Sequence, residues 1–192
     1  MRPFLKVLTL VSTLVLAHTA HADWQLTPNS SVSYVSIKNN AIAEHNAFSG
    51  VSGGLSDNGL LTVNIDLSSV ETGVDIRNQR MREVFFEVID YPEAVVTAQL
   101  DDQELAHVAS GAPLVTTKTV SVSLHGVTAQ AEAQVLAVSA GDRVWVSTLQ
   151  PILISAGDFG LGEGVSALQA LAGLNAIAGV VPVSVDLRLQ QR

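Results

Sequence analysis

Alternating apolar and polar residues run along most of this chain and predict β-strands. The cleanest example covers residues 61–67, where the odd positions are apolar and the even positions are polar. The same period of two recurs at residues 31–37, 94–100, 120–135, 143–154 and 181–190. Side chains of a strand alternate between the two faces of a sheet, so each segment has one apolar and one polar face. Such strands either stack as a sandwich or close into a barrel.

A helical pattern interrupts this alternation before Pro92. Five apolar side chains recur at the i, i+3, i+4, i+7, i+8 spacing of one helical face, namely Met81, Val84, Phe85, Val88 and Ile89. Asp75 is the expected N-cap of this helix. Pro92 ends the segment, because proline lacks a backbone donor and restricts the residue before it. A helix with one apolar face needs an apolar surface to cover.

A row of small apolar side chains marks one predicted strand. Ala129, Ala131, Ala133 and Val135 share one face. Such a row leaves more room than leucines would, which indicates a cavity, although a closely packed neighbour would need small residues too. A second short apolar segment, at residues 168–172, is available to cap an opening. We therefore favour an all-β antiparallel barrel of about eight strands, with one or two short capping helices, over a sandwich.

Residues 1–22 are typical of a cleaved signal peptide. Arg2 and Lys6 precede a short apolar run, and the Ala-His-Ala at residues 20–22 fits a small-x-small cleavage site. The mature chain is then one domain, residues 23–192. An N-terminal anchor left in place is the alternative. No later apolar run approaches the ~20 residues of a membrane span, so we expect a periplasmic protein without stable membrane insertion.

The charge and the cysteine content of the chain limit the classes of ligand and partner that it can bind. Removing Arg2 and Lys6 with the signal peptide lowers the net charge by two, from −8 to −10. A charge of this sign disfavours nucleic acid and anionic lipid surfaces, which require clustered Lys and Arg. An uncharged hydrophobic ligand feels no such field. The chain has no cysteine, which excludes thiol catalysis and thiolate metal sites.

The remaining titratable residues form no recognisable catalytic or metal-binding motif. After the signal peptide the histidines are His45, His107 and His125, and none accompanies a nucleophile motif or a zinc motif. His125 lies at a predicted hairpin corner, where a structural role fits better than catalysis. The acidic residues at 101–104 are interpreted as a solvated turn rather than an acid–base or calcium site. We predict no enzyme, no catalytic residue, no metal and no cofactor.

Three arginines lie mainly off the apolar stripe of the predicted helix. Arg77, Arg80 and Arg82 could together hold an acidic head group. The interpretation that we favour places them on a solvated helix face, paired with Glu83 and Glu87.

Several segments, in order, resemble the YceI-like family of polyisoprenoid-binding proteins. W-x-L-x-P-x-x-S, from Trp24 to Ser31, is similar to the family's first strand, although family members often have histidine at the position of Ser30. FSGVSGGL and VNIDLSSVETG resemble the second and third strands, and IRNQRMREVFFEVIDYP resembles the family's helix with its double aromatic and Tyr-Pro. VSVSLHGVT and SAGDFGLGEG resemble a hairpin and the loop before the last strand. The likeness extends over nearly all of the mature chain.

The resemblance implies an extended, lipocalin-like barrel that holds a long isoprenoid or similar fatty amphiphile. The implied role is transport, storage or sequestration of this lipid, with an isoprenoid quinone as one candidate ligand. The family likeness carries no catalytic residues, and it allows a homodimer and a membrane cytochrome or other quinone-linked partner. Two alternatives stay open: an enzyme acting on an isoprenoid lipid, and an interaction domain with a filled core and no ligand.

The residues expected to line a lipid cavity come from three places: the inward rows of the strands, the helix, and the glycine-rich loop before the last strand. They are Val63, Ile65, Met81, Val84, Phe85, Phe86, Val122, Ala131, Phe159 and Val183.

Overall fold

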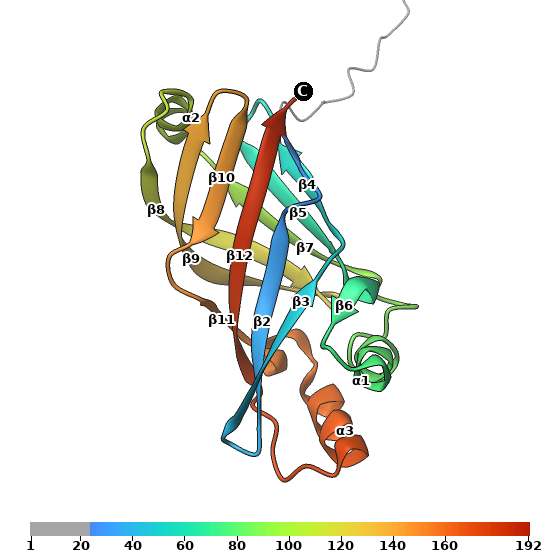
Figure 1. Ribbon diagram of the computed structural model, residues 1–192. Helices are drawn as coiled ribbons and strands as arrows, with labels where there is room; N and C mark the ends of the chain where they lie inside the picture. Colours follow the sequence, from blue (N-terminus) through green and yellow to red (C-terminus); the bar gives the residue numbers. More distant parts are fainter. Residues whose placement is uncertain (1–23) are drawn as a thin grey trace, which may run out of the picture.

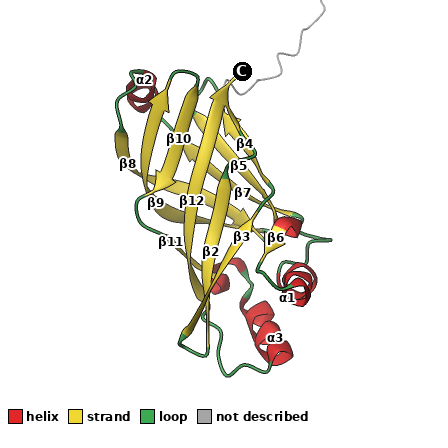
Figure 2. Ribbon diagram, in the orientation of Figure 1, coloured by secondary structure: helices red, strands yellow, loops and turns green. Residues whose placement is uncertain are grey.

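One antiparallel sheet of twelve strands dominates the computed structural model, which describes residues 24–192 (Figures 1 and 2). The predicted signal peptide lies outside these residues. The strands are β1 (Trp24–Leu26), β2 (Ser31–Lys38), β3 (Ile42–Phe48), β4 (Val51–Leu55), β5 (Leu60–Asp66), β6 (Val70–Glu71), β7 (Glu93–Gln99), β8 (Leu114–Leu124), β9 (Val127–Ala140), β10 (Arg143–Thr148), β11 (Ile152–Ser155) and β12 (Val180–Gln191).

Eight of these strands close into a ring. Their hydrogen-bonded order is β1–β4–β5–β7–β8–β9–β10–β12, and β12 pairs back with β1 through Leu26 and Leu189. The predicted antiparallel barrel is therefore confirmed. A ring of about eight strands encloses room for side chains or for one ligand.

Strand β12 belongs both to the ring and to an extension at the lower end of Figure 1. Its C-terminal half pairs with β10 and β1, and its N-terminal half pairs with β11 and β2. Beside β2, strands β3 and β6 continue the extension. The single strand predicted at residues 143–154 is thus wrong, because β10 and β11 are separate. Pro151 lies at the break, where a residue without an amide donor is tolerated.

The alternation of apolar residues sets the inner face of the barrel as predicted. On β5, Val63 and Ile65 are buried, and Leu67 after the strand is 1% exposed. On β9, Ala133 and Ala137 are buried on the inner face. The small side chains of β9 leave space in the middle of the barrel rather than filling it.

Short helices lie at both ends of the barrel (Figures 1 and 2). The helix α1 (Asp75–Arg80), the π-helix that continues it (Met81–Phe85) and α3 (Gly162–Ala172) lie at the lower end, and α2 (Asp102–Ala109) lies at the upper end. Single 3₁₀ turns cover Leu67–Ser69 and Ala156–Phe159. None of the helices in residues 24–192 combines the length and the apolar character that crossing a bilayer requires.

The helix predicted between residues 75 and 89 is shorter than its apolar pattern. Asp75 is the first helical residue rather than the N-cap; Val74 occupies that position, without a side-chain cap. The π-helix ends at Phe85, with Phe86 as its C-cap, and Glu87 adopts a positive φ of 49°, which turns the chain away from the helix axis. Ile89 is consequently 94% exposed, so its predicted place on the apolar face is wrong.

The acidic segment at residues 101–104 is a helix start rather than a solvated turn. Asp101 accepts hydrogen bonds from the backbone amides of Gln103 and Glu104, and the Glu104 carboxylate accepts one from the backbone amide of Asp101. This reciprocal capping box satisfies amides that the first turn of α2 leaves unpaired.

Candidate functional site

A cavity of about 480 Å³ runs through the barrel. At the lower end it is lined by α1, α3 and the segment before β12. Val74 and Ile76 line it there while remaining 44% and 53% exposed, so the cavity meets the surface at this end, which we call the mouth. At the other end it reaches Glu104 of α2. Along β8 it extends from Leu114 to Leu124, which corresponds to about 30 Å of strand.

Apolar side chains form the wall between the two ends. They come from alternate positions of β2, β5, β7, β8, β9, β10 and β12, so one face of each of these strands is apolar. Those of the central section include Leu61, Val63, Ile65, Val96, Ala98, Val120, Val122, Ala133, Val135, Ala137, Val146, Val183 and Val185. Such an interior excludes water and accepts an apolar chain.

Most of the residues that the sequence indicated for the cavity line it. They are Val63, Ile65, Met81, Phe85, Phe86, Val122 and Val183. Phe86 is 5% exposed and packs edge-on against Phe85, with the ring centroids 4.8 Å apart. Contact of these residues with a lipid stays a prediction.

Three of the indicated residues do not line the cavity. Val84 lies in the π-helix, partly buried and off its inner side. Ala131 shares the inner face of β9 but packs against a cluster that contains Phe159. Phe159 is 3% exposed inside that cluster, and its neighbour Leu161 is the one that reaches the cavity wall. The structure thus places these three side chains beside the cavity wall rather than on it, and their contact with a lipid stays a prediction.

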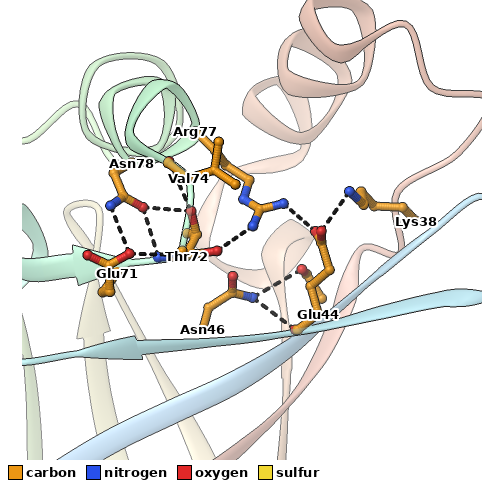
Figure 3. Close-up of polar contacts among 10 residues, drawn as sticks. Lys38, Glu44, Asn46, Glu71, Thr72, Val74, Arg77 and Asn78 are labelled. Atoms are coloured by element: carbon orange, nitrogen blue, oxygen red, sulfur yellow. Dashed lines mark hydrogen bonds and ion pairs between the residues drawn. The ribbon is translucent and has the colours of Figure 1, made fainter.

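A cluster of charged side chains, which we call the mouth cluster, lies where α1 faces β2 and β3 (Figure 3). It consists of Lys38, Glu44 and Arg77. The Glu44 carboxylate lies 2.8 Å from Lys38 Nζ and 2.6 Å from an Arg77 guanidinium nitrogen. Two cations and one anion leave one net positive charge, and Arg80 also lines the cavity at this end.

Neighbouring polar groups hold the mouth cluster in place. Arg77 donates a hydrogen bond to the Thr72 carbonyl oxygen. Thr72 in turn donates through its amide, at 2.8 Å, and its hydroxyl, at 2.6 Å, to the Asn78 side-chain oxygen. Asn78 donates to Glu71 at 3.1 Å (Figure 3). The Asn78 hydrogen bond, together with the Gly73 amide, keeps the pKa of Glu71 below its usual value.

The electrostatics of the mouth cluster keep Glu44 ionised. Partial burial raises the pKa of Glu44, but the hydrogen bonds and charges of Lys38 and Arg77 outweigh it and hold the pKa below its usual value. Burial raises the pKa of the nearby Tyr34 hydroxyl well above its usual range. Arg77 Nε is buried without a hydrogen-bond partner among the residues of the described chain. A buried donor of this kind calls for an acceptor.

These contacts correct the sequence interpretation of the arginines. Arg77 faces the cavity and pairs with Glu44 rather than with Glu83 or Glu87. Glu87 instead binds His125, with 2.8 Å between the Glu87 carboxylate and His125 Nε2. His125 also lies 4.1 Å from the Tyr91 ring, between centroids, and has a positive φ of 52° at the hairpin corner. These contacts fit the structural role predicted for His125.

A second charged pair lies inside the barrel at the α2 end. Lys118 Nζ lies 2.7 Å from Glu104 Oε2, and the Thr116 hydroxyl donates to Glu104 Oε1 at 3.1 Å. Burial raises the pKa of Glu104, but the Lys118 hydrogen bond, the capping amide of Asp101 and the Thr116 hydroxyl together hold it below its usual value.

Three charged residues that were not expected in the cavity also line it, namely Lys38, Glu44 and Lys118. Each occupies an inward position of an alternating strand: Lys38 follows the row of Val32 and Tyr34, and Lys118 precedes the row of Val120 and Val122. A charged residue at a position that the alternation assigns to the inner face is the signal that could have identified them.

Known proteins share both the sequence pattern and the fold of this chain. The family model that describes the YceI-like domain matches residues 24–189 of the sequence. No curated protein matched the sequence.

Several solved structures share the fold. A polyisoprenoid binding domain from Saccharophagus degradans, implicated in plant cell wall breakdown, is 34% identical with a TM-score of 0.85; the match covers 90% of this chain and 100% of that domain. BcnA from Burkholderia cenocepacia is 19% identical with a TM-score of 0.63, over 83% of this chain and 95% of that one. A YceI protein from Campylobacter jejuni is 13% identical with a TM-score of 0.53, over 100% and 99%. The last two matches concern the fold alone.

Proposed function

Because this chain belongs to the YceI-like family, we propose that it binds a long-chain isoprenoid or similar amphiphilic lipid in its barrel cavity. The observation that carries the proposal is a long apolar cavity with a charged cluster at its mouth. An amphiphile matches this distribution, because its tail is apolar and its head is polar. The 34% identical neighbour, a polyisoprenoid binding domain, supports the isoprenoid assignment. An interaction domain with a filled core does not fit a cavity of about 480 Å³.

The cavity wall can supply the affinity. Burying one CH₂ group contributes ~0.8 kcal/mol, so two isoprene units approach the gross free energy of micromolar binding. Association and the ordering of the tail then cost several kcal/mol. A longer tail therefore offsets these costs, which favours a ligand of several isoprene units.

The polar head belongs at the mouth in this proposal. Arg77 lines the cavity at the mouth, and the mouth cluster has one net positive charge. Both features favour a head group that accepts hydrogen bonds or is negatively charged. A carbonyl of an isoprenoid quinone is one such head group.

The proposed setting is the periplasm, where the protein would carry, store or sequester its lipid. The sequence of residues 1–22 supports export, and cell fractionation with an intact-mass measurement tests it. The homodimer and the cytochrome or quinone-linked partner stay predictions from the family likeness.

Uptake by delipidated protein tests the proposed function. We expect the protein to take up a long-chain prenyl alcohol and an isoprenoid quinone with about micromolar affinity or tighter. Ala137→Phe places a large ring on the inner face of β9, opposite Leu114 at the α2 end of the cavity, and should strongly reduce the uptake of long chains. Ala140→Phe, at an exposed position of the same strand, is the matched control and should bind normally. A delipidated wild-type protein that binds neither compound contradicts the proposal.

We infer binding without turnover. The 34% identical neighbour, a polyisoprenoid binding domain, supports this inference. The ligand recovered after long incubation should have an unchanged mass. A product of new mass that Arg77→Met no longer forms would instead favour an enzyme acting on the lipid.

A further inference from the structure

Exposed aliphatic side chains surround the mouth at the lower end of the barrel (Figure 1). Ile42 lies at the β2–β3 hairpin, Ile76 lies in α1 and Leu171 lies in α3, and each of them is half-exposed. We call the hairpin residues 39–43, the α1 residues 74 and 76, and residues 170–180 the mouth face.

The mouth face is continuous with the cavity wall. Ile42 lies opposite Lys38 in the β2–β3 ladder, and residues directly opposite in an antiparallel pair share one face. Because Lys38 lines the cavity, Ile42 extends the inner row of β3 past the cavity edge. Ile76 lines the cavity itself, and Leu171 follows the lining residue Leu168 by one turn of α3. The mouth therefore opens inside an aliphatic rim.

Hydrogen bonds tie the β2–β3 hairpin to the segment before β12. The Asn39 amide donates to the Ala176 carbonyl oxygen at 2.8 Å, and the Asn39 side-chain oxygen accepts from the Asn175 amide at 2.9 Å. The Ala178 amide donates to the Ile37 carbonyl oxygen at 2.9 Å. These bonds hold two separate segments of the mouth face together, so the surface is preformed.

The composition of the mouth face favours a lipid bilayer over a protein partner. Residues 39–43 and 164–185 contain no charged residue, although the chain as a whole has a net charge of −8. They also contain none of the aromatic, methionine or arginine residues that are enriched in protein interfaces. A bilayer of zwitterionic lipid accepts an uncharged aliphatic surface, whereas an anionic bilayer repels a chain of negative net charge.

A long isoprenoid tail needs a route that avoids water. Each methylene group that enters water costs free energy, so the barrier to release through water grows with tail length. Where the mouth meets a bilayer, the tail moves from one apolar environment directly into another.

We propose that the mouth face docks reversibly onto a bilayer of zwitterionic lipid, and that the lipid tail passes between this bilayer and the cavity at the contact. The inference rests on the proposed function, because the contact serves transfer only if the cavity holds a lipid.

Transfer of an isoprenoid quinone from phosphatidylcholine vesicles to the delipidated protein tests the proposal. The wild-type rate should rise with vesicle concentration, because contact limits it, and added phosphatidylglycerol should slow it. Ile42→Asp with Leu171→Asp places two charges on the mouth face without touching the cavity lining and should slow transfer about tenfold. Leu60→Asp with Val115→Asp makes the same change at exposed positions near α2 and should transfer like the wild type.

Calorimetric titration with a short, water-soluble prenyl alcohol separates docking from cavity binding. Both double variants should bind this alcohol like the wild type, which also shows that they are folded. Ile42→Asp alone is a milder second variant and should slow transfer in the same direction.

A transfer rate that does not depend on vesicle concentration, or that is unchanged in the folded mouth-face variants, overturns the docking proposal. A wild-type dimer that Ile42→Asp with Leu171→Asp dissociates, without any change in transfer, overturns it too and assigns the mouth face to a second copy of this chain. Failure of the wild type to bind both the short alcohol and the quinone overturns the proposed function, and the docking proposal with it.

Discussion

At the scale of single residues, Arg77 connects the helix α1 to the cavity and to the strands. Its guanidinium binds Glu44 at 2.6 Å and donates to the Thr72 carbonyl oxygen, while Nε is buried without a hydrogen-bond partner within residues 24–192. The side chain is thus anchored by two groups and held at the cavity wall. The proposed role of Arg77 in head-group binding rests on this geometry.

Arg77→Met should weaken the binding of a long-chain fatty acid by about tenfold, because the carboxylate loses a charged donor. The methyl ester of the same fatty acid should lose much less. Titration of both compounds separates a head-group effect from a general loss of the cavity. Arg82→Met is the control, because Arg82 does not line the cavity. Equal losses for the acid and the ester would contradict a head-group role for Arg77.

Glu44 should make the stability of the protein depend on acid pH. Its pKa in the folded chain is lowered, so its stabilising contribution is fully present above its unfolded pKa of ~4.3 and is lost as the pH falls toward the folded value. Glu104 contributes in the same direction. Denaturant titrations between about pH 5 and about pH 3 should show a smaller drop in the free energy of unfolding for Glu44→Gln than for the wild type. The exposed Glu132→Gln should follow the wild type; a Glu44→Gln curve that does so too would rule out the effect.

At the residue level, the sequence predicted the inner face correctly for most apolar positions of the strands and missed the charged ones. Val63 and Ile65 could be placed on the inner wall because alternation fixes the face of every residue in a strand. Lys38, Glu44 and Lys118 obey the same alternation, but charged side chains are expected in solvent. Their inward position depends on partners from other elements, such as Arg77 and Glu104, which periodicity cannot reveal.

At the scale of elements, the α1 and π-helix segment forms part of the wall at the mouth. Phe85 lines the cavity and also packs against α3, where a Cβ added at Gly164 would lie 3.1 Å from the Phe85 ring. Gly164 therefore allows α3 to approach the π-helix closely. The two helices together cover the lower end of the barrel.

Phe85→Asp should reduce the lipid retained by the purified protein, because it puts a charge into the apolar wall and loosens the contact with α3. Mass spectrometry of the extracted lipid, normalised to protein, measures the retention. Ile89→Asp makes the same change at a side chain that is 94% exposed and should retain lipid like the wild type. Unchanged retention in a folded Phe85→Asp variant would show that the ring serves packing alone.

Helices and strands could be predicted where the spacing of apolar residues stays regular along the segment. They could not be predicted where contacts between distant segments determine the structure. The helix at α1 and the segment at α3 follow apolar spacing, and both exist. Helix α2 is short and acidic, and its capping box at Asp101 and Glu104 was interpreted as a turn. β10 pairs with the C-terminal half of β12, whereas β11 pairs with its N-terminal half. The break between β10 and β11 therefore depends on long-range pairing, which no local sequence pattern encodes.

At the scale of the whole molecule, closure of the barrel depends on the pairing of β1 with β12. Trp24 lies opposite Gln191, so the two ends of the described chain complete the ring. Alternation alone could not separate a barrel from a sandwich, because both need one apolar face per strand. The family motifs, which extend from β1 to the loop before β12, favoured the barrel, and the match over residues 24–189 confirms the resemblance.

A closed barrel with small residues on β9 and charged groups at both ends has the shape of a container for one amphiphile. In the proposed function, the apolar wall supplies the affinity and the mouth cluster binds the head group. Each of these roles assumes that a lipid occupies the cavity.

Organic extraction of the protein, purified without detergent from periplasmic fractions and analysed by mass spectrometry, tests that assumption most directly. The proposed function predicts about one long-chain isoprenoid, such as a quinone or a prenyl alcohol, per protein molecule, and a strongly reduced amount from Ala137→Phe purified in parallel. An extract without any isoprenoid or fatty amphiphile, from a protein that also takes up none after delipidation, would contradict the proposed function.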